Sequence, residues 1–229
     1  MFVDVVFPKG NEEKFISVAE KLGYSGVCFV YDFSSADVKK IQQKIEKLRK
    51  KSKKVNVYLG FVANAGNCAK ARNSCELVLL KSSDKNHDNL EKKDFDVIFD
   101  LEMNPMKDTM HYRVSGLNQV LCSLAVKKKK IIGINLRNII DAENKSQVIG
   151  RIMQNVMLCS KHKAKMIIFS GASKALQMKG YHDLISLMAV LGMKEDDAKA
   201  VLKNSLERIK ENIKKKTPEY LKEGVEIIK

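Results

Sequence analysis

The chain lacks the features of an exported or membrane-bound protein. No apolar run reaches 18 residues, and Asp4 places a charge where a signal peptide needs an apolar stretch. The cysteines are five, an odd number, and none forms a C-x-x-C pair, so neither a disulfide framework nor a zinc-binding pattern is present. Cys28 lies in a strand-like run, and Cys122 and Cys159 lie on apolar faces of expected helices, as buried free thiols do. We therefore expect a soluble cytoplasmic protein that has no membrane partner.

Motifs for nucleotide binding and hydrolysis are also missing. The sequence contains no G-x-x-x-x-G-K-[ST], no G-x-G-x-x-G and no G-x-S-x-G. A hydrolytic metal site needs several imidazole and carboxylate ligands that converge. The four histidines are scattered, at positions 87, 111, 162 and 182. The sequence thus argues against a phosphoesterase site with two or three metal ions, and we expect no metal ligand in this chain.

Arginine is scarce, whereas lysine is abundant. Six of the 42 basic residues are arginines, and the 27 acidic residues leave a formal charge of +15. Such an excess favours a polyanionic partner, for example RNA, an acidic protein or an anionic surface. Lysine-rich surfaces also serve solubility or heat tolerance, so the lysines alone do not decide between these roles. Arginine forms fixed donor forks, which makes the six arginines the sharper candidates.

Short β-branched runs alternate with helical periodicity along most of the chain. This order, with strands that are apolar on both faces, is typical of an α/β fold with a parallel sheet covered by helices. Seven such units in this length favour a TIM-like (β/α) barrel with about seven parallel strands, and an open doubly wound sheet is the alternative. The expected strands are Phe2–Phe7, Gly26–Val30, Val55–Val62, Leu77–Lys81, Phe95–Leu101, Ile131–Leu136 and Met166–Ser170.

The residues after Ser173 have only helical patterns. We expect helices at Leu184–Leu191, Asp196–Leu202 and Leu206–Ile213, followed by the basic run Lys214–Lys216. Proline fits the first turn of a helix, so Thr217–Glu219 is expected to begin a short one. The predicted organisation is a barrel domain over residues 1–205 and a basic helical extension over 206–229, packed on the barrel or trailing from it.

The segment His111–Asn118 places a histidine, an arginine and a serine before a helix expected at Gly116–Lys127. The start of a helix exposes unpaired N–H groups and the positive end of the helix dipole, which receives phosphate well. Arg113 would add donors and His111 a titratable group. The plainer interpretation is an ordinary helix start, capped by Ser115 and with Arg113 solvated.

One further feature lies at the end of an expected strand, and another lies within one. The turn Ser170–Ser173 consists of small residues and offers N–H groups to a phosphate; alternatively it is a tight turn that needs Gly171 for its backbone freedom. Asp4 alternates with Val3 and Val5, so we expect it to face the barrel interior. There it needs a cation or several donors, and a structural ion pair is the favoured role.

Five segments resemble, in order, the ribonuclease P protein component 3 family, the archaeal counterpart of the thirty-kilodalton subunit of the eukaryotic enzyme. They are Phe2–Pro8 (FVDVVFP), Leu22–Val27 (LGYSGV), His111–Asn118 (HYRVSGLN), Ile168–Ser173 (IFSGAS) and Leu191–Met193 (LGM). The resemblance covers the chain to about residue 205. It implies a TIM-like barrel related to the polymerase and histidinol phosphatase (PHP) phosphoesterases, within a ribonucleoprotein whose RNA removes the 5′ leader of precursor tRNA.

PHP enzymes begin with Asp-x-His-x-His on the first strand. Here Asp4 matches the aspartate, but Val6 and Pro8 stand at the histidine positions and cannot bind a metal. The resemblance therefore implies a chain that is not itself catalytic and binds no cofactor, with Mg²⁺ on the RNA subunit. The implied partners are the ribonuclease P RNA and a smaller protein subunit, as a heterodimer or heterotetramer, with precursor tRNA contacted indirectly.

The candidates for contact with RNA or the partner are basic residues and residues at the strand ends: Arg72, His111, Arg113, Ser115, Lys127, Arg137, Ser170, Gly171, Ser173 and Lys174. Two other functions stay open at this point. One is a free-standing PHP phosphoesterase, and the other is a metabolic barrel enzyme that holds a phosphorylated substrate at the Ser170–Ser173 turn. Val6 and Pro8 argue against the first.

Overall fold

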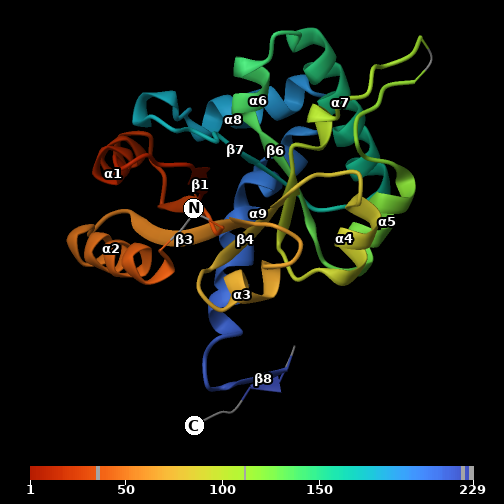
Figure 1. Ribbon diagram of the computed structural model, residues 1–229. Helices are drawn as coiled ribbons and strands as arrows, with labels where there is room; N and C mark the ends of the chain where they lie inside the picture. The colour runs from red at the N-terminus through yellow and green to blue at the C-terminus, as the bar shows by residue number, and fades with distance from the viewer. Residues whose placement is uncertain (35–36, 111, 223–224, 227–229) are drawn as a thin grey trace.

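The fold is a nearly closed barrel of seven parallel strands with helices around it, in a computed structural model that describes residues 1–34, 37–110, 112–222 and 225–226 (Figure 1). The strands pair in chain order, which confirms the TIM-like barrel; a doubly wound sheet would reverse its order at a switch point. They are β1 (Val3–Val6), β2 (Gly26–Asp32), β3 (Asn56–Ala63), β4 (Leu77–Lys81), β5 (Val97–Phe99), β6 (Ile131–Asn135) and β7 (Met166–Phe169).

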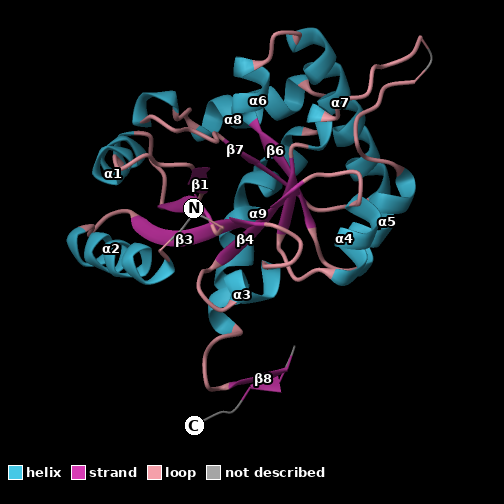
Figure 2. Ribbon diagram, viewed as in Figure 1, coloured by secondary structure: helices cyan, strands magenta, loops and turns pink. Residues whose placement is uncertain are grey.

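The helices surround the strands, except that the last long helix lies across one end of the barrel (Figure 2). They are α1 (Glu12–Lys21), α2 (Val38–Lys51), α3 (Cys68–Arg72), α4 (Asn86–Lys92), α5 (Gln119–Lys127), α6 (Leu136–Asp141), α7 (Lys145–His162), α8 (Tyr181–Val190) and α9 (Glu195–Lys214), with 3-10 turns η1 (Leu101–Met103) and η2 (Ala175–Gln177). Among the described residues, no helix combines the length and the apolar character that crossing a bilayer requires.

The barrel interior is filled by apolar side chains, so it is a core and not a channel. Phe99 of β5, Phe169 of β7 and Phe7, which follows β1, have ring centroids 6.1–6.4 Å apart. Val3 and Val5 belong to the same interior cluster. A second, larger cluster fills the space between the strands and the helices. Because both faces of the strands are buried, their sequences are nearly continuous apolar runs.

The barrel closes between β1 and β7 through the residues that follow β7. The N–H of Gly171 donates to the Val5 carbonyl at 3.2 Å, and the N–H of Phe7 donates to the Ala172 carbonyl at 2.9 Å. The Asp4 carboxylate adds a side-chain link, because its Oδ1 accepts from the N–H of Ser170 at 2.8 Å. This turn is therefore part of the barrel wall.

Helix α9 crosses the N-terminal end of the barrel and seals it. Leu206 and Ile209 enter the interior cluster, and Ser205 Oγ donates to the Val3 carbonyl at 3.0 Å. The two helices expected at 196–202 and 206–213 are thus one, and the predicted boundary after residue 205 falls inside it. The short helix expected at Thr217–Glu219 is also wrong, since the chain continues there into the antiparallel pair β8 (Tyr220–Lys222) and β9 (Val225–Glu226).

Candidate nucleic-acid interface

Acidic and amide side chains gather at the C-terminal ends of β5 and β6, which form part of the rim of the barrel. The Nδ2 of Asn138 donates to Asp100 Oδ1 and to Glu102 Oε1, both at 2.7 Å. Asp100 itself has a left-handed backbone (φ 62°), and its Oδ2 lies 3.5 Å from the Nζ of exposed Lys81. Asn138, on α6, therefore bridges two carboxylates that would otherwise repel each other.

Burial changes the charge state of this cluster. Glu102 is almost fully buried, and this burial raises its pKa to about 7; the hydrogen bond from Asn138 opposes the rise and the charge of Asp100 adds to it. Near neutral pH the carboxyl is thus partly protonated. Two cations lie beside the pair, Lys81 at the Asp100 carboxylate and Arg151, which donates to the Glu102 backbone carbonyl and not to its carboxylate. The cluster supports the structure of the rim and resembles no complete hydrolytic site.

Asp4 does not face the barrel interior, contrary to expectation. Val3 and Val5 lie in the interior cluster, so strand alternation turns Asp4 toward the helix layer, where its charge acts on Tyr24. The expected ion pair is also wrong, because Oδ1 accepts from two backbone N–H groups, of Val5 at 2.9 Å and Ser170 at 2.8 Å. Its Oδ2 has no hydrogen-bond partner among the described residues, and burial raises its pKa to about 6.

The N–H groups of residues 170–174 all donate within the chain. Those of Ser170 and Gly171 go to Asp4 and Val5, and that of Ala172 goes to Ser170 Oγ at 3.2 Å. The remaining two, on Ser173 and Lys174, go to Gln177 Oε1 at 3.1 and 3.0 Å. The prediction that this turn offers its backbone N–H groups to a phosphate is therefore wrong, since all of these donors already have acceptors within the chain.

Gly171 has the structural role that the plainer interpretation gave it. Its backbone is left-handed (φ +60°), and a Cβ at this position would lie 2.0 Å from Asn135 Oδ1. Ser173 Oγ accepts from Arg137 Nη1 at 2.5 Å, and Arg137 also pairs with Asp141 at 2.6 Å. The structure thus brings Arg137 and Ser173 together at the rim, with exposed Lys174 next in the chain.

Residues 104–118, described except at 111, form a long segment that projects beside α7 (Figure 1). Buried Arg151 on α7 holds its base. The guanidinium donates to the carbonyls of Glu102, Asn104 and Met106 at 3.0, 2.7 and 2.5 Å, and it pairs with Asp108 at 2.8 Å. Sequence reasoning missed this residue, because an arginine inside a helical pattern is most often solvated.

The middle of this segment also rests on α7. Arg113 Nη1 donates to the Gly150 carbonyl at 3.2 Å, and the guanidinium packs against the Gly150 Cα. Ser115 is buried, and its carbonyl accepts from Asn155 Nδ2 at 2.9 Å. The expected serine cap is wrong, since α5 starts later and Asn118 caps it by accepting from the N–H of Leu121. His111 lies outside the described residues.

Two of the sequence candidates lie at the opposite end of the barrel. Arg72 ends α3 and pairs with buried Asp96 at 2.6 Å and with Asp94 at 3.4 Å, just before β5. Lys127 ends α5, just before β6, and is exposed. The candidates thus occupy three places: the rim, the 104–118 segment and the N-terminal end. On α4, the exposed side chains of His87, Asp88 and Glu91 have ligand atoms within 4.8 Å of one another.

Comparison with known families decides between the alternatives. The family model described as RNase P subunit p30 matches residues 1–217. The chain belongs to the RNase P subunit p30 family. Among its relatives, ribonuclease P protein component 3 of Methanosarcina acetivorans is 27% identical over 55% of this chain and 54% of that protein. The protein of the same name from Methanococcus vannielii is 26% identical over 69% and 67%.

The match spans about half the length of the Methanosarcina protein and 67% of the Methanococcus vannielii one. Two solved structures share the fold. One is a chain from the cryo-EM structure of archaeal ribonuclease P with mature tRNA. It has a TM-score of 0.84 at 19% sequence identity, and the match covers 99% of this chain and 98% of that chain. Histidinol phosphate phosphatase from Lactococcus lactis, complexed with zinc, has a TM-score of 0.60 at 12% identity, covering 84% and 94%.

Proposed function

We propose that this protein is a non-catalytic subunit of ribonuclease P, the ribonucleoprotein that removes the 5′ leader of precursor tRNA. Membership of the RNase P subunit p30 family, over residues 1–217, is the observation that carries the proposal. The sequence at and just after β1 supports it, because Val6 and Pro8 replace the two histidines of the PHP metal motif. The chain works in the cytoplasm and binds no cofactor, and Mg²⁺ acts on the RNA subunit.

The basic surface supports a role in RNA binding. A formal charge of +15 neutralises phosphates and helps a folded RNA hold its Mg²⁺. At the rim, the Arg137 side chain and exposed Lys174 supply the donors that the backbone of the 170–174 turn does not. Precursor tRNA is contacted indirectly, through the RNA subunit.

A smaller protein subunit is the second partner, in a heterodimer or heterotetramer. The 104–118 segment and the adjoining α7 supply a surface for it, because large apolar side chains are exposed on both. These are Met106, Met110 and Tyr112 on the segment and Met153 and Met157 on α7. Methionine adapts its shape to a partner, which suits an interface of this kind.

Reconstitution of the complex tests the proposal. Ribonuclease P RNA and its other protein subunits are assembled with and without this chain, and cleavage of precursor tRNA is measured at low Mg²⁺. We expect the complete set to cleave faster than the set that lacks this chain. Equal rates would contradict the proposal.

The rival function, a free-standing phosphoesterase, is supported by the shared fold alone. Its test is hydrolysis of a phosphomonoester by the isolated chain with added Zn²⁺ or Mn²⁺. We expect no hydrolysis above the rate of a matched Asp4→Asn, Glu102→Gln variant. Chelator-sensitive turnover with stoichiometric bound metal would establish the rival.

A further inference from the structure

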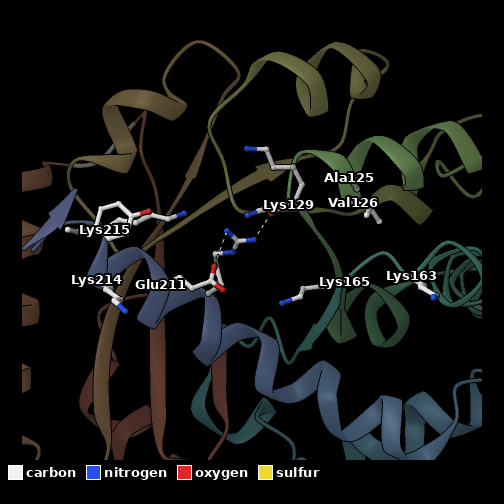
Figure 3. A pocket seen from close by; sticks show the side chains of 11 residues that line it. Ala125, Val126, Lys129, Lys163, Lys165, Glu211, Lys214 and Lys215 are labelled. Carbon is white, nitrogen blue, oxygen red and sulfur yellow. Dashed lines mark hydrogen bonds and ion pairs between the residues drawn. The ribbon is translucent and has the colours of Figure 1, made fainter. Parts of the chain in front are cut away.

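A basic cavity lies at the N-terminal end of the barrel, opposite the rim. It has a volume of about 470 Å³ and opens where the C-terminal ends of α5, α7 and α9 meet (Figure 3). Among the described residues, six lysines and Arg208 line it against one carboxylate, Glu211. The six are Lys129, Lys130, Lys163, Lys165, Lys214 and Lys215.

Two of these cations are built into the wall of the cavity. Arg208 is buried on α9, donates to the Lys129 carbonyl, and lies 3.4 Å from Glu211 and 3.9 Å from Asp96. Lys130 donates from Nζ to the Phe95 carbonyl at 2.8 Å, and burial lowers its pKa. The Arg208 contact joins α9 to the end of α5, and the Lys130 contact joins the residue before β6 to the segment before β5, which gives the cavity a defined shape.

Other lysines face solvent from separate elements. Lys163 follows α7, Lys165 precedes β7 and Lys215 follows α9, and all three are exposed. Each helix C-terminus carries about half a negative charge, so three ends neutralise roughly one and a half of the positive charges. Acidic side chains offset part of the rest: Glu211 lines the cavity, Asp96 lies 3.9 Å from Arg208, and Glu207 lies 4.0 Å from Lys165. Seven cations against these three carboxylates and the helix ends still leave a surplus of roughly two positive charges, which capping of the helix ends does not account for.

We propose that this cavity binds the phosphodiester backbone of RNA, at a site separate from the rim. The inference rests on the proposed function and gives it a second RNA-binding face. Lysines suit this ligand, because flexible point charges contact phosphates without reading the sequence. Half-buried Tyr220 also lines the cavity, and an aromatic ring beside a basic groove is the combination that stacks single-stranded bases. This ring favours RNA over an acidic protein as the ligand.

The test compares two triple variants of the full chain. The cavity variant carries Lys163→Ala, Lys165→Ala and Lys215→Ala. The control carries Lys39→Ala, Lys40→Ala and Lys47→Ala on exposed positions of α2, so both lose three positive charges. The affinity for a labelled single-stranded RNA of mixed sequence is measured by fluorescence anisotropy across a salt series. Melting temperatures verify the fold, and single substitutions replace any triple variant that melts lower.

We expect the cavity variant to lose at least about tenfold in affinity for the RNA. The slope of log affinity against log salt concentration should become shallower by about 2, since each of three lost phosphate contacts removes about 0.7. The control should lose less than about threefold. Equal losses would overturn the proposal, because the RNA would then sense only total charge. Salt-sensitive binding unchanged in both variants would overturn the cavity site and leave the proposed function standing, whereas no RNA binding by the unmodified chain would contradict both.

Discussion

Arg151 on α7 and Asp108 in the 104–118 segment form an ion pair of 2.8 Å across 43 residues of sequence. The arginine is nearly inaccessible, and its remaining donors bind three backbone carbonyls of residues 102–106. The pair holds the pKa of Asp108 below its usual range, mainly through the hydrogen bond from Arg151. This guanidinium positions the start of the segment that carries Arg113 and the exposed methionines.

Arg151→Ala is expected to lower the free energy of unfolding by about 3 kcal/mol, because it leaves carbonyls and a carboxylate without their donor. Arg113→Ala is the matched control, since that side chain is exposed and, among the described residues, makes one hydrogen bond, to the Gly150 carbonyl. Its cost should not exceed about 1 kcal/mol. Urea unfolding followed by circular dichroism measures both. Similar costs would show that Arg151 is not the anchor of the segment.

Stability is expected to fall as pH rises from about 4.5 to 7. The folded chain raises the pKa of Glu102 from 4.5 to about 7, so within this window the folded state holds a proton that the unfolded state releases. Above pH 7 the ionised Glu102 lowers the free energy of unfolding by about 3 kcal/mol. Asp4, whose pKa is raised to about 6, makes the free energy of unfolding fall with pH in the same way at lower pH.

Glu102→Gln isolates the contribution of this one group. The amide keeps an oxygen for the Asn138 hydrogen bond and cannot ionise, so the variant should be at least as stable as the parent at pH 8. Its unfolding free energy should also vary less between pH 5 and pH 8. An undiminished slope in the variant would assign the pH dependence to other groups.

Gly171→Ala is expected to destabilise the barrel closure by about 3 kcal/mol, since it combines a left-handed backbone with a clash against Asn135. Gly10→Ala separates the two causes. Gly10 also has a positive φ, +80°, but a Cβ there meets nothing within 4 Å. We expect about 1 kcal/mol for Gly10→Ala. Equal effects in thermal unfolding would mean that the approach of Asn135 costs nothing.

Arg137→Ala is expected to reduce precursor-tRNA cleavage in the reconstituted complex with little change in melting temperature, because the residue is half-buried at the rim. Loss of a charge-assisted phosphate contact corresponds to about 1.5–3 kcal/mol, or roughly ten- to hundredfold. Arg137→Lys keeps the positive charge but loses the planar set of guanidinium donors, so we expect it to retain part of the cleavage activity that the alanine variant loses. Full activity of the alanine variant would remove Arg137 from the interface.

The strands were predictable from sequence because both of their faces are buried. β4, for example, is the uninterrupted run LVLL followed by Lys81, and its predicted bounds are those observed. α9 was split in the prediction, since Asn204 and Ser205 interrupt its apolar spacing. Their side chains bind carbonyls of the barrel, Asn204 that of Met166 and Ser205 that of Val3, which no local pattern reveals.

The site was less predictable, because its partners are distant in sequence. Asp4 and Gln177 accept from the N–H groups of Ser170, Ser173 and Lys174, and neither has a motif that indicates this role. Arg208 is buried against Asp96, 112 positions away. The family resemblance was readable in short segments, whereas the burial of these polar residues needed the fold.

RNA bound to the protein in its native cell tests the central claim most directly. The tagged full chain is purified under mild salt, and the RNA that copurifies is sequenced against a mock purification. The account predicts strong enrichment of the ribonuclease P RNA, together with cleavage of precursor tRNA by the purified material. Recovery of the chain without that RNA and without this activity would contradict it.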